Sequence, residues 1–135
     1  MAARIVIVDD DMDDIILLNE LFSTTEFAEG IQFFSNPEGV IPFFDSLAGN
    51  ELPSLVITDL NMPKLNGFEL LQRLKADSHY RNIPVLAYTT SNSEKDKQRA
   101  ICLGAKDFIT KPTERNGYHM LVEKIRAMLK EEDHV

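Results

Sequence analysis

Short apolar runs alternate along the chain with longer stretches in which apolar residues recur at helical spacing. The first run, at 5–8, is continuous, as in a strand that is buried on both faces. Residues 13–24 then place Ile15, Leu18 and Phe22 on one face of a helix. The same alternation predicts five strands, at residues 5–8, 31–34, 54–59, 84–89 and 107–110.

A helix is expected after each strand. Pro37, with Ser35 or Asn36 as the cap, is typical of a helix start, whereas Gly49 and Gly104 are typical of helix ends. Helical spacing marks the later helices through Val40, Ile41, Phe43, Phe44 and Leu47, through Phe68, Leu71 and Leu74, over 93–103, and through Leu121, Ile125, Met128 and Leu129. Strands that each lead into a helix imply an α/β fold with a parallel sheet and helices on both faces. The Asn116-Gly117 pair interrupts the pattern where the last helix should begin.

Length and composition favour one ordinary globular domain over residues 1–135, with a core at about 3–130 and a frayed acidic tail at 131–135. No repeat, linker or second domain is evident in the sequence, so any output is expected to pass through the surface of this domain.

Charge and cysteine content narrow the class of protein. The formal net charge of −8 argues against a nucleic-acid surface, because no basic stripe exists to release counterions from phosphates. The sequence has neither a secretory signal pattern nor an apolar run of membrane-spanning length, so no membrane partner is expected. A single cysteine, Cys102, cannot form an internal disulfide, which fits a cytoplasmic location.

Polar side chains stand at the ends of four of the predicted strands. Asp9 and Asp10 follow the first strand, Asp59 ends the third, Thr89 ends the fourth and Lys111 follows the fifth. A buried carboxylate is costly unless it has partners, and the carboxyl ends of parallel strands meet at one edge, where ligands bind. The sequence therefore predicts that three acids, a hydroxyl and an amine form one site.

The three carboxylates would repel one another unless a cation binds them. Two unit charges ~4 Å apart cost roughly 4 kcal/mol at an effective dielectric of about 20. Carboxylate and carbonyl oxygens suit Mg²⁺ better than zinc, which prefers His or Cys. Lys111 and Thr89 can bind phosphoryl oxygens, which leaves Asp59 as the candidate nucleophile. None of the histidines stands at a predicted strand end: His79, His119 and His134.

Four separated strings resemble the receiver domain of two-component response regulators: VDDD at 8–11, TDLNMPKLNGFELL at 58–71, YTTS at 88–91 and DFITKP at 107–112. The resemblance covers almost the whole chain, and the strings occur in the family's order. It implies a flavodoxin-like (CheY-like) fold, with a five-stranded parallel sheet in the order 2-1-3-4-5 and helices on both faces.

The resemblance also implies roles for the site residues. Asp59 would accept a phosphoryl group from a sensor histidine kinase or a histidine phosphotransfer protein. Asp9, Asp10 and Asp59 would hold Mg²⁺ (or Mn²⁺) together with the main-chain carbonyl of Asn61. In this reading the protein is no enzyme beyond its own phosphorylation and dephosphorylation.

The remaining family roles concern the response to phosphorylation. Lys111 would pair with the phosphoryl group, and its peptide bond to Pro112 would be cis. Thr89 would move toward that group, and Phe108 would swing into the vacated space. The switch would change the face formed by the fourth helix, fifth strand and last helix, where an unknown output partner or a second copy would bind. Exposed candidates on this face are Lys97, Lys106 and Asp107.

Some residues depart from the usual family pattern. Thr90 stands where the family usually has a small residue, which should narrow the path to Asp59. Asn61 and Ser91 occupy the two positions that tune dephosphorylation in receivers. The Thr-Thr-Ser string in a lone receiver is similar to phytochrome-associated single-domain receivers.

Simpler interpretations stay open. Asp9 and Asp10 could only cap the first helix, and Asp11, Asp13 and Asp14 are expected to be a solvated helix start. A phosphate-independent pseudo-receiver is one alternative function, although no acid or lysine of the pattern is missing. A Mg²⁺-dependent phosphatase of the haloacid-dehalogenase type is another, but Asn61 replaces the second acid that this class requires.

Overall fold

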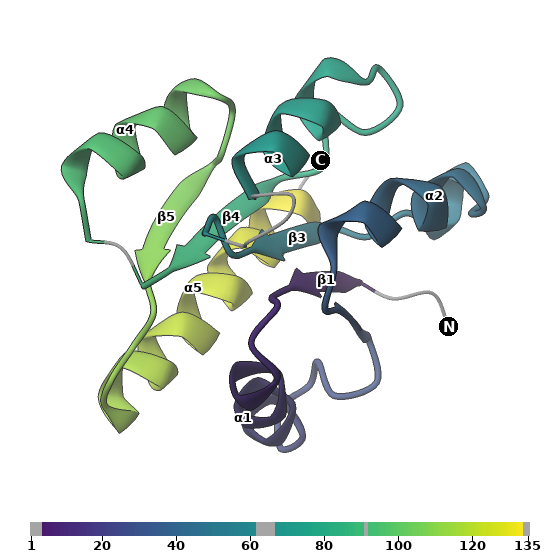
Figure 1. The fold of residues 1–135 in the computed structure, drawn as a ribbon. Coiled ribbons are helices and arrows are strands. Elements are labelled where there is room, and N and C mark those ends of the chain that lie inside the picture. The colour runs from purple at the N-terminus through teal and green to yellow at the C-terminus, as the bar shows by residue number, and fades with distance from the viewer. Residues whose placement is uncertain (1–3, 62–66, 91, 134–135) are drawn as a thin grey trace.

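The computed structural model describes residues 4–61, 67–90 and 92–133. Its centre is a parallel five-stranded sheet in the order β2-β1-β3-β4-β5, which confirms the predicted architecture and strand order (Figure 1). The strands are β1 (Ile5–Val8), β2 (Ile31–Phe34), β3 (Leu55–Thr58), β4 (Val85–Thr89) and β5 (Asp107–Thr110).

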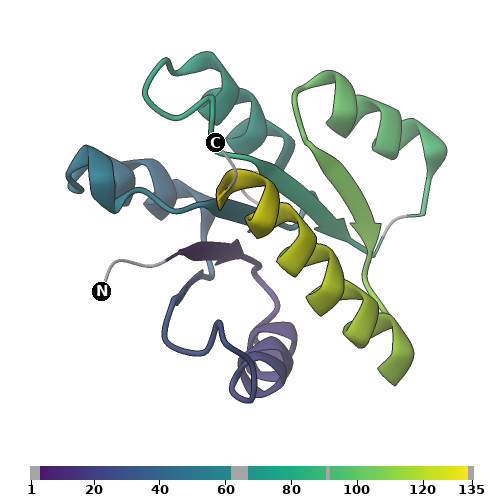
Figure 2. The ribbon, with the colours of Figure 1, turned by 180° about the vertical axis from the view of Figure 1, so that it is seen from behind.

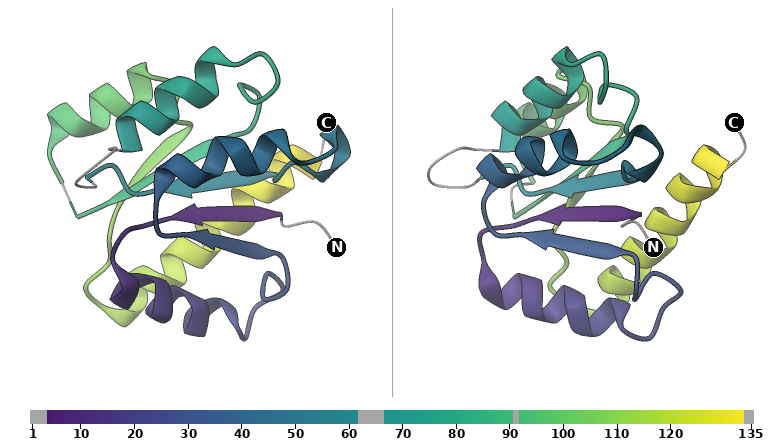
Figure 3. Two further views of the ribbon diagram at one scale, coloured as in Figure 1. Left: turned by 45° about the vertical axis from the view of Figure 1, so that its right-hand side comes forward. Right: turned by 90° about the vertical axis from the view of Figure 1, so that its right-hand side faces the viewer.

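Helices cover both faces of the sheet. Figure 3 shows α2, α3 and α4 on one face and α1 and α5 on the other, and Figure 2 shows α5 crossing behind the sheet. The helices are α1 (Met12–Phe22), α2 (Val40–Asp45), α3 (Gly67–Ala76), α4 (Glu94–Cys102) and α5 (Arg115–Asp133). Among the described residues, no helix is both long enough and apolar enough to span a membrane.

The central strands divide their side chains between two cores, because successive residues of a strand point to opposite faces. On β1, Val6 and Val8 join the core under α2, α3 and α4, whereas Ile5 and Ile7 join the core under α1 and α5. All four residues are at most 1% exposed. Burial on both faces explains why this strand is apolar throughout rather than alternating.

The first helix begins close to the predicted position, at Met12, and ends at Phe22. Asp11 has an extended backbone, and its side chain accepts a hydrogen bond from the N–H of Asp13 at 2.9 Å, so Asp11 is the N-cap of α1. Asp9 and Asp10 lie before the cap. The interpretation of these two residues as helix caps is therefore wrong, and both are available to the edge of the sheet.

The second helix starts as predicted but is shorter. Asn36 caps a 3₁₀ turn at Pro37–Gly39 by accepting the N–H of Glu38 at 2.9 Å, and α2 follows. The helix ends at Asp45, ahead of Gly49, because the Ser46 hydroxyl donates to the Phe43 carbonyl at 2.6 Å.

The last helix runs through the Asn116-Gly117 pair that interrupts the sequence pattern. A Cβ on Gly117 would lie 2.6 Å from Cβ of Pro112, so the glycine permits close packing at the start of α5. The helix also continues to Asp133, so helical backbone reaches into the acidic tail.

Candidate functional site

The backbone hydrogen bonds of the sheet continue into the polar residues at the strand ends. Asp9, Asp59 and Lys111 each directly follow a strand, and Thr89 is the last residue of β4. Their N–H groups still donate to the neighbouring strand: Asp9 to Phe34 at 3.0 Å, Asp59 to Val8 at 2.9 Å and Lys111 to Thr89 at 2.6 Å. These residues are therefore held as firmly as the strands themselves, where the strand order reverses between β1 and β3.

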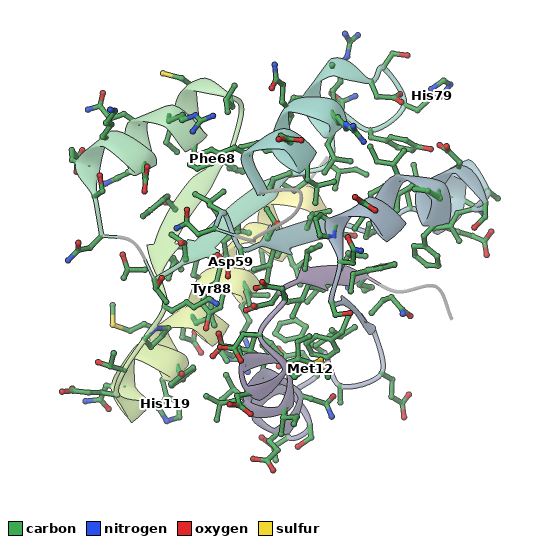
Figure 4. The ribbon with its side chains drawn as sticks, viewed as in Figure 1. Met12, Asp59, Phe68, His79, Tyr88 and His119 are labelled. Carbon is green, nitrogen blue, oxygen red and sulfur yellow. The ribbon has the colours of Figure 1, made fainter. Side chains whose placement is uncertain are left out.

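Three carboxylates converge at this edge. Asp9, Asp10 and Asp59 each offer an oxygen, and these oxygens all lie within 4.8 Å of one another. Asp9 is fully buried, Asp59 is buried, and Asp10 is exposed. Figure 4 shows Asp59 at the carboxyl end of β3, near Tyr88 of the adjacent strand β4.

Lys111 points its ammonium into the acidic cluster. Its Nζ lies 2.7 Å from Asp14 Oδ2 and 2.9 Å from both Asp59 Oδ2 and Asp9 Oδ2, and 5.5 Å from the centre of the Tyr88 ring. Burial alone would lower the pKa of Lys111, but its contacts with Asp14, Asp9 and Asp59 outweigh burial and raise that pKa. The lysine is therefore a permanent ammonium at neutral pH.

Asp9 has a different electrostatic setting from an ordinary carboxylate. Burial, partly offset by Lys111, raises the pKa of Asp9 from 3.8 to about 6. Its Oδ1 accepts the N–H of Asp11 at 2.9 Å. Its buried Oδ2 has no hydrogen bond of normal geometry, although the Lys111 ammonium is close. A buried oxygen with spare acceptor capacity suits a bound cation.

The donor set fits a hard divalent ion such as Mg²⁺ or Mn²⁺. Asp9, Asp10 and Asp59 offer oxygen only, and one ammonium cannot neutralise them all. In Figure 4, His79 and His119 lie at the periphery, away from Asp59. A zinc site would require nitrogen or sulfur ligands that these residues do not bring to the edge.

Asn61 links the acid of β3 to the hydroxyl of β4. Its N–H donates to Asp59 Oδ1 at 3.1 Å, and its Nδ2 donates to Thr89 Oγ1 at 3.0 Å. Thr89 is fully buried, whereas Thr90 is exposed. Ser91 lies outside the described residues.

Phe108 lies one strand away from these groups. It pairs in register with Ala87 of β4, and its half-buried ring packs against the core under α2, α3 and α4. The described contacts place it beside the site but not among the charged residues.

The peptide bond between Lys111 and Pro112 corrects an expectation. No cis bond occurs among the described residues, so this bond is trans rather than cis. The trans form of a prolyl bond is favoured by roughly 0.5–1 kcal/mol, and here it already lets the ammonium of Lys111 reach three carboxylates.

Two residues of the site escape sequence reasoning. Asp14 was expected to be solvated, yet it makes the shortest of the three contacts of Lys111. The two residues are 97 positions apart, and no local signal relates them. Gly67 is the other, because a Cβ there would lie 1.8 Å from the carbonyl oxygen of Asp59, a contact only glycine avoids.

Comparisons with known proteins identify the family. The model of the response regulator receiver domain matches residues 5–126, so the chain belongs to this family. Protein PilH of Pseudomonas aeruginosa is 33% identical over 94% of this chain and 98% of its own length. Several other curated relatives are longer: the chain spans 26% of response regulator PleD of Caulobacter vibrioides, 51% of RpaA of Synechocystis and 16% of protein RcaC of Microchaete diplosiphon.

Solved structures agree with the family. The Mn²⁺-bound response regulator Rcp1 is 26% identical with a TM-score of 0.77, covering 91% of each chain. The phosphorylated cyanobacterial phytochrome response regulator RcpA is 26% identical with a TM-score of 0.79, covering 93% of this chain and 91% of its own. The acidic cluster and Lys111 thus lie within a receiver fold.

Proposed function

We propose that this chain acts as a receiver that takes a phosphoryl group onto Asp59 from a sensor histidine kinase or a histidine phosphotransfer protein. One observation carries the proposal. The carboxylate of Asp59 shares a buried edge with Asp9 and Asp10, and it lies 2.9 Å from the ammonium of Lys111. A nucleophile, a cation site and a counter-charge for phosphoryl oxygens thus stand together.

The transfer forms a bond between an Asp59 oxygen and phosphorus while the phosphorus–nitrogen bond of the donor breaks. The electron pair of that bond stays on the imidazole nitrogen of the donor, and the phosphoryl group moves without a change in oxidation state. Lys111 stabilises the negative charge on the phosphoryl oxygens. Asn61, whose N–H contacts Asp59 Oδ1, holds the acceptor carboxylate in place.

Asp9, Asp10, Asp59 and the main-chain carbonyl of Asn61 are the proposed ligands of Mg²⁺. These ligands would hold a hard cation, which would supply positive charge against the carboxylate and phosphoryl oxygens. The Mn²⁺-bound Rcp1 structure supports an exchange of Mg²⁺ for Mn²⁺.

Phosphorylation is proposed to move Thr89 and Phe108. The Thr89 hydroxyl would exchange its contact with Asn61 for a phosphoryl oxygen, and Phe108 would follow into the core. The output surface is then the face of α4, β5 and α5, through which a partner or a second copy binds. Lys97 and Lys106 are exposed on this face.

Thr90 is proposed to restrict small phosphodonors, with Asn61 and Ser91 setting the phosphoryl lifetime. Turnover of external phosphate esters is not part of the proposal, since Asn61 cannot act as a general acid. The proposed location is the cytoplasm, where histidine kinases present their phosphohistidine.

Intact-mass analysis with phosphoramidate tests the proposal. The wild-type protein with Mg²⁺ should gain the mass of one phosphoryl group, whereas EDTA or the Asp59→Asn substitution should prevent the gain. Asp77→Asn is a matched control, because Asp77 accepts the N–H of His79, which lies at the periphery away from Asp59 (Figure 4), and this variant should react like the wild type.

The outcomes separate the alternatives. Transfer from a phosphohistidine protein but not from phosphoramidate would support phosphoryl acceptance and identify Thr90 as the restriction, to be relieved by Thr90→Ala. No adduct from either donor would refute phosphoryl acceptance and favour the pseudo-receiver.

A further inference from the structure

Three carboxylates surround Lys111, but they do not have the same surroundings. Asp9 and Asp59 also belong to the acidic cluster that fits a divalent ion. Asp14 does not belong to that cluster, and in the described contacts its carboxylate accepts a hydrogen bond from Lys111. It belongs to the first turn of α1, whereas the other two acids directly follow strands of the sheet.

A divalent ion and the ammonium compete for the same two carboxylates. Lys111 Nζ is 2.9 Å from an oxygen of Asp9 and from an oxygen of Asp59. Two positive ions on the same carboxylates repel strongly over so short a distance, most of all in a buried site. We therefore expect the ammonium to move away from these oxygens when the ion binds, and its side chain is only 8% exposed, so water offers it little room.

We propose that Asp14 is the positioning residue that receives the ammonium of Lys111 when a divalent ion occupies Asp9 and Asp59. Asp14 is already the nearest of the three carboxylates, at 2.7 Å, and its side chain is 25% exposed, so water still reaches it. It thereby holds Lys111 beside the site, ready to contact a phosphoryl group on Asp59. This inference rests on the proposed function.

The neighbouring acids cannot fill this role. The carboxylate of Asp11 is engaged as the cap of α1, and Asp13 is exposed. The Tyr88 ring, 5.5 Å from the ammonium, is fully packed in the core and limits where the lysine can go. Buried Leu18 and Phe22 fasten α1 to the sheet, which keeps Asp14 at its distance from Lys111.

Calorimetric titration with Mg²⁺ of the metal-free protein tests the inference without relying on phosphorylation. Asp14→Asn should weaken Mg²⁺ binding about fivefold, because the ammonium then stays on Asp9 and Asp59. Asp13→Asn removes the same charge from the same helical turn but should change the affinity less than about twofold. Asp14→Glu should restore most of the lost affinity.

A double-mutant cycle with Lys111→Met isolates the route of the effect. Without the ammonium there is nothing for Asp14 to receive, so Asp14→Asn should then have no more effect than Asp13→Asn. An equal loss of affinity with and without Lys111 would overturn the inference, since Asp14 would act through its charge alone. Equal affinities of Asp14→Asn and Asp13→Asn in the wild-type background would also overturn it.

The inference and the proposed function can fail separately. If phosphoramidate labels the wild type but the Mg²⁺ cycle shows no coupling, only the role of Asp14 is wrong. If coupling is found but no adduct forms with any donor, phosphoryl acceptance fails while Asp14 still positions Lys111. A wild type that binds no Mg²⁺ would refute both.

Discussion

At the scale of single residues, the acidic residues in the stretch 9–14 have different roles although they are neighbours in the sequence. Asp9 is a buried member of the cation cluster, and Asp10 is its exposed member. Asp11 caps a helix, Asp13 faces solvent and Asp14 contacts Lys111. A run that looks uniform in composition therefore contains five distinct electrostatic environments.

Asp9 makes the stability of the folded protein depend on pH. Its pKa is raised in the folded state to about 6 from an ordinary value of 3.8. The folded protein thus binds this proton more tightly than the unfolded chain does, so the associated stability is present below about pH 4 and is lost as the pH rises through about 6. Two units of pKa correspond to roughly 2–3 kcal/mol for a fully buried group.

We predict that Asp9→Asn changes the pH profile of the metal-free protein. Asparagine does not titrate, so the free energy of unfolding of the variant relative to wild type should increase by about 2 kcal/mol between about pH 4 and about pH 8. Urea denaturation in EDTA at both pH values measures this difference. Parallel profiles for the two proteins would show that Asp9 has the same pKa folded and unfolded.

At the scale of secondary structure, the cap of α1 separates the cluster residues from the helix. Asp11 has φ −88° and ψ 108°, outside the helical region, and this turn directs Asp9 and Asp10 to the edge of the sheet. The helix is fastened by Leu18 and Phe22, which are at most 2% exposed. The cap thus sets where the acidic cluster ends and where the helix begins.

Asp11→Ala should lower the free energy of unfolding by about 1 kcal/mol, because the N–H of Asp13 loses its acceptor. Asp13→Ala is the matched control: it removes an acid from the first turn but leaves the cap intact, and it should cost about half as much or less. Urea denaturation in EDTA compares the two. Equal losses would mean that the helix dipole, and not the cap, accounts for the stabilisation.

At the scale of the whole molecule, the site and the proposed output face are joined by β5. Lys111 follows this strand directly, and Phe108 lies within it. Asp107 at its start forms an ion pair with Lys124 of α5, and this contact lowers the pKa of Asp107 against the opposing effect of burial. A change at the proposed phosphoryl site can thus reach the packing of α5 through one short strand.

If the face of α4, β5 and α5 is the output surface, charge reversal there should abolish phosphorylation-dependent association. We predict that Lys97→Glu with Lys106→Glu removes the shift in sedimentation that phosphoramidate and Mg²⁺ induce, alone or with the output partner. Both lysines are exposed, and the loss should exceed about tenfold in affinity.

Arg73→Glu with Arg81→Glu serves as a control of equal charge change, since Arg73 is exposed on α3 and Arg81 is exposed in the turn before β4. The control variant should associate nearly as well as the wild type. Unchanged association of the Lys97 and Lys106 variant, with phosphorylation intact, would exclude this face as the output surface.

The local patterns of the chain were sufficient for much of the fold. Continuous apolar runs predicted buried strands because β1 and β3 are covered on both faces. Boundaries were less predictable where local hydrogen bonds intervene, as at Ser46, which ends α2 early. Gly117 looked like an interruption because its reason, the approach of Pro112, is a contact between segments.

The sequence by itself determined which chemical groups stand at the ends of the parallel strands, because a strand's periodicity and its last residue are both local properties. It therefore indicated Asp9, Asp10, Asp59, Thr89 and Lys111 as one site. Only the tertiary structure decided that Asp14 pairs with Lys111 and that Gly67 must lie against the carbonyl of Asp59. Each of these depends on distances between segments that meet only after the sheet has assembled, and no spacing along the chain encodes such distances.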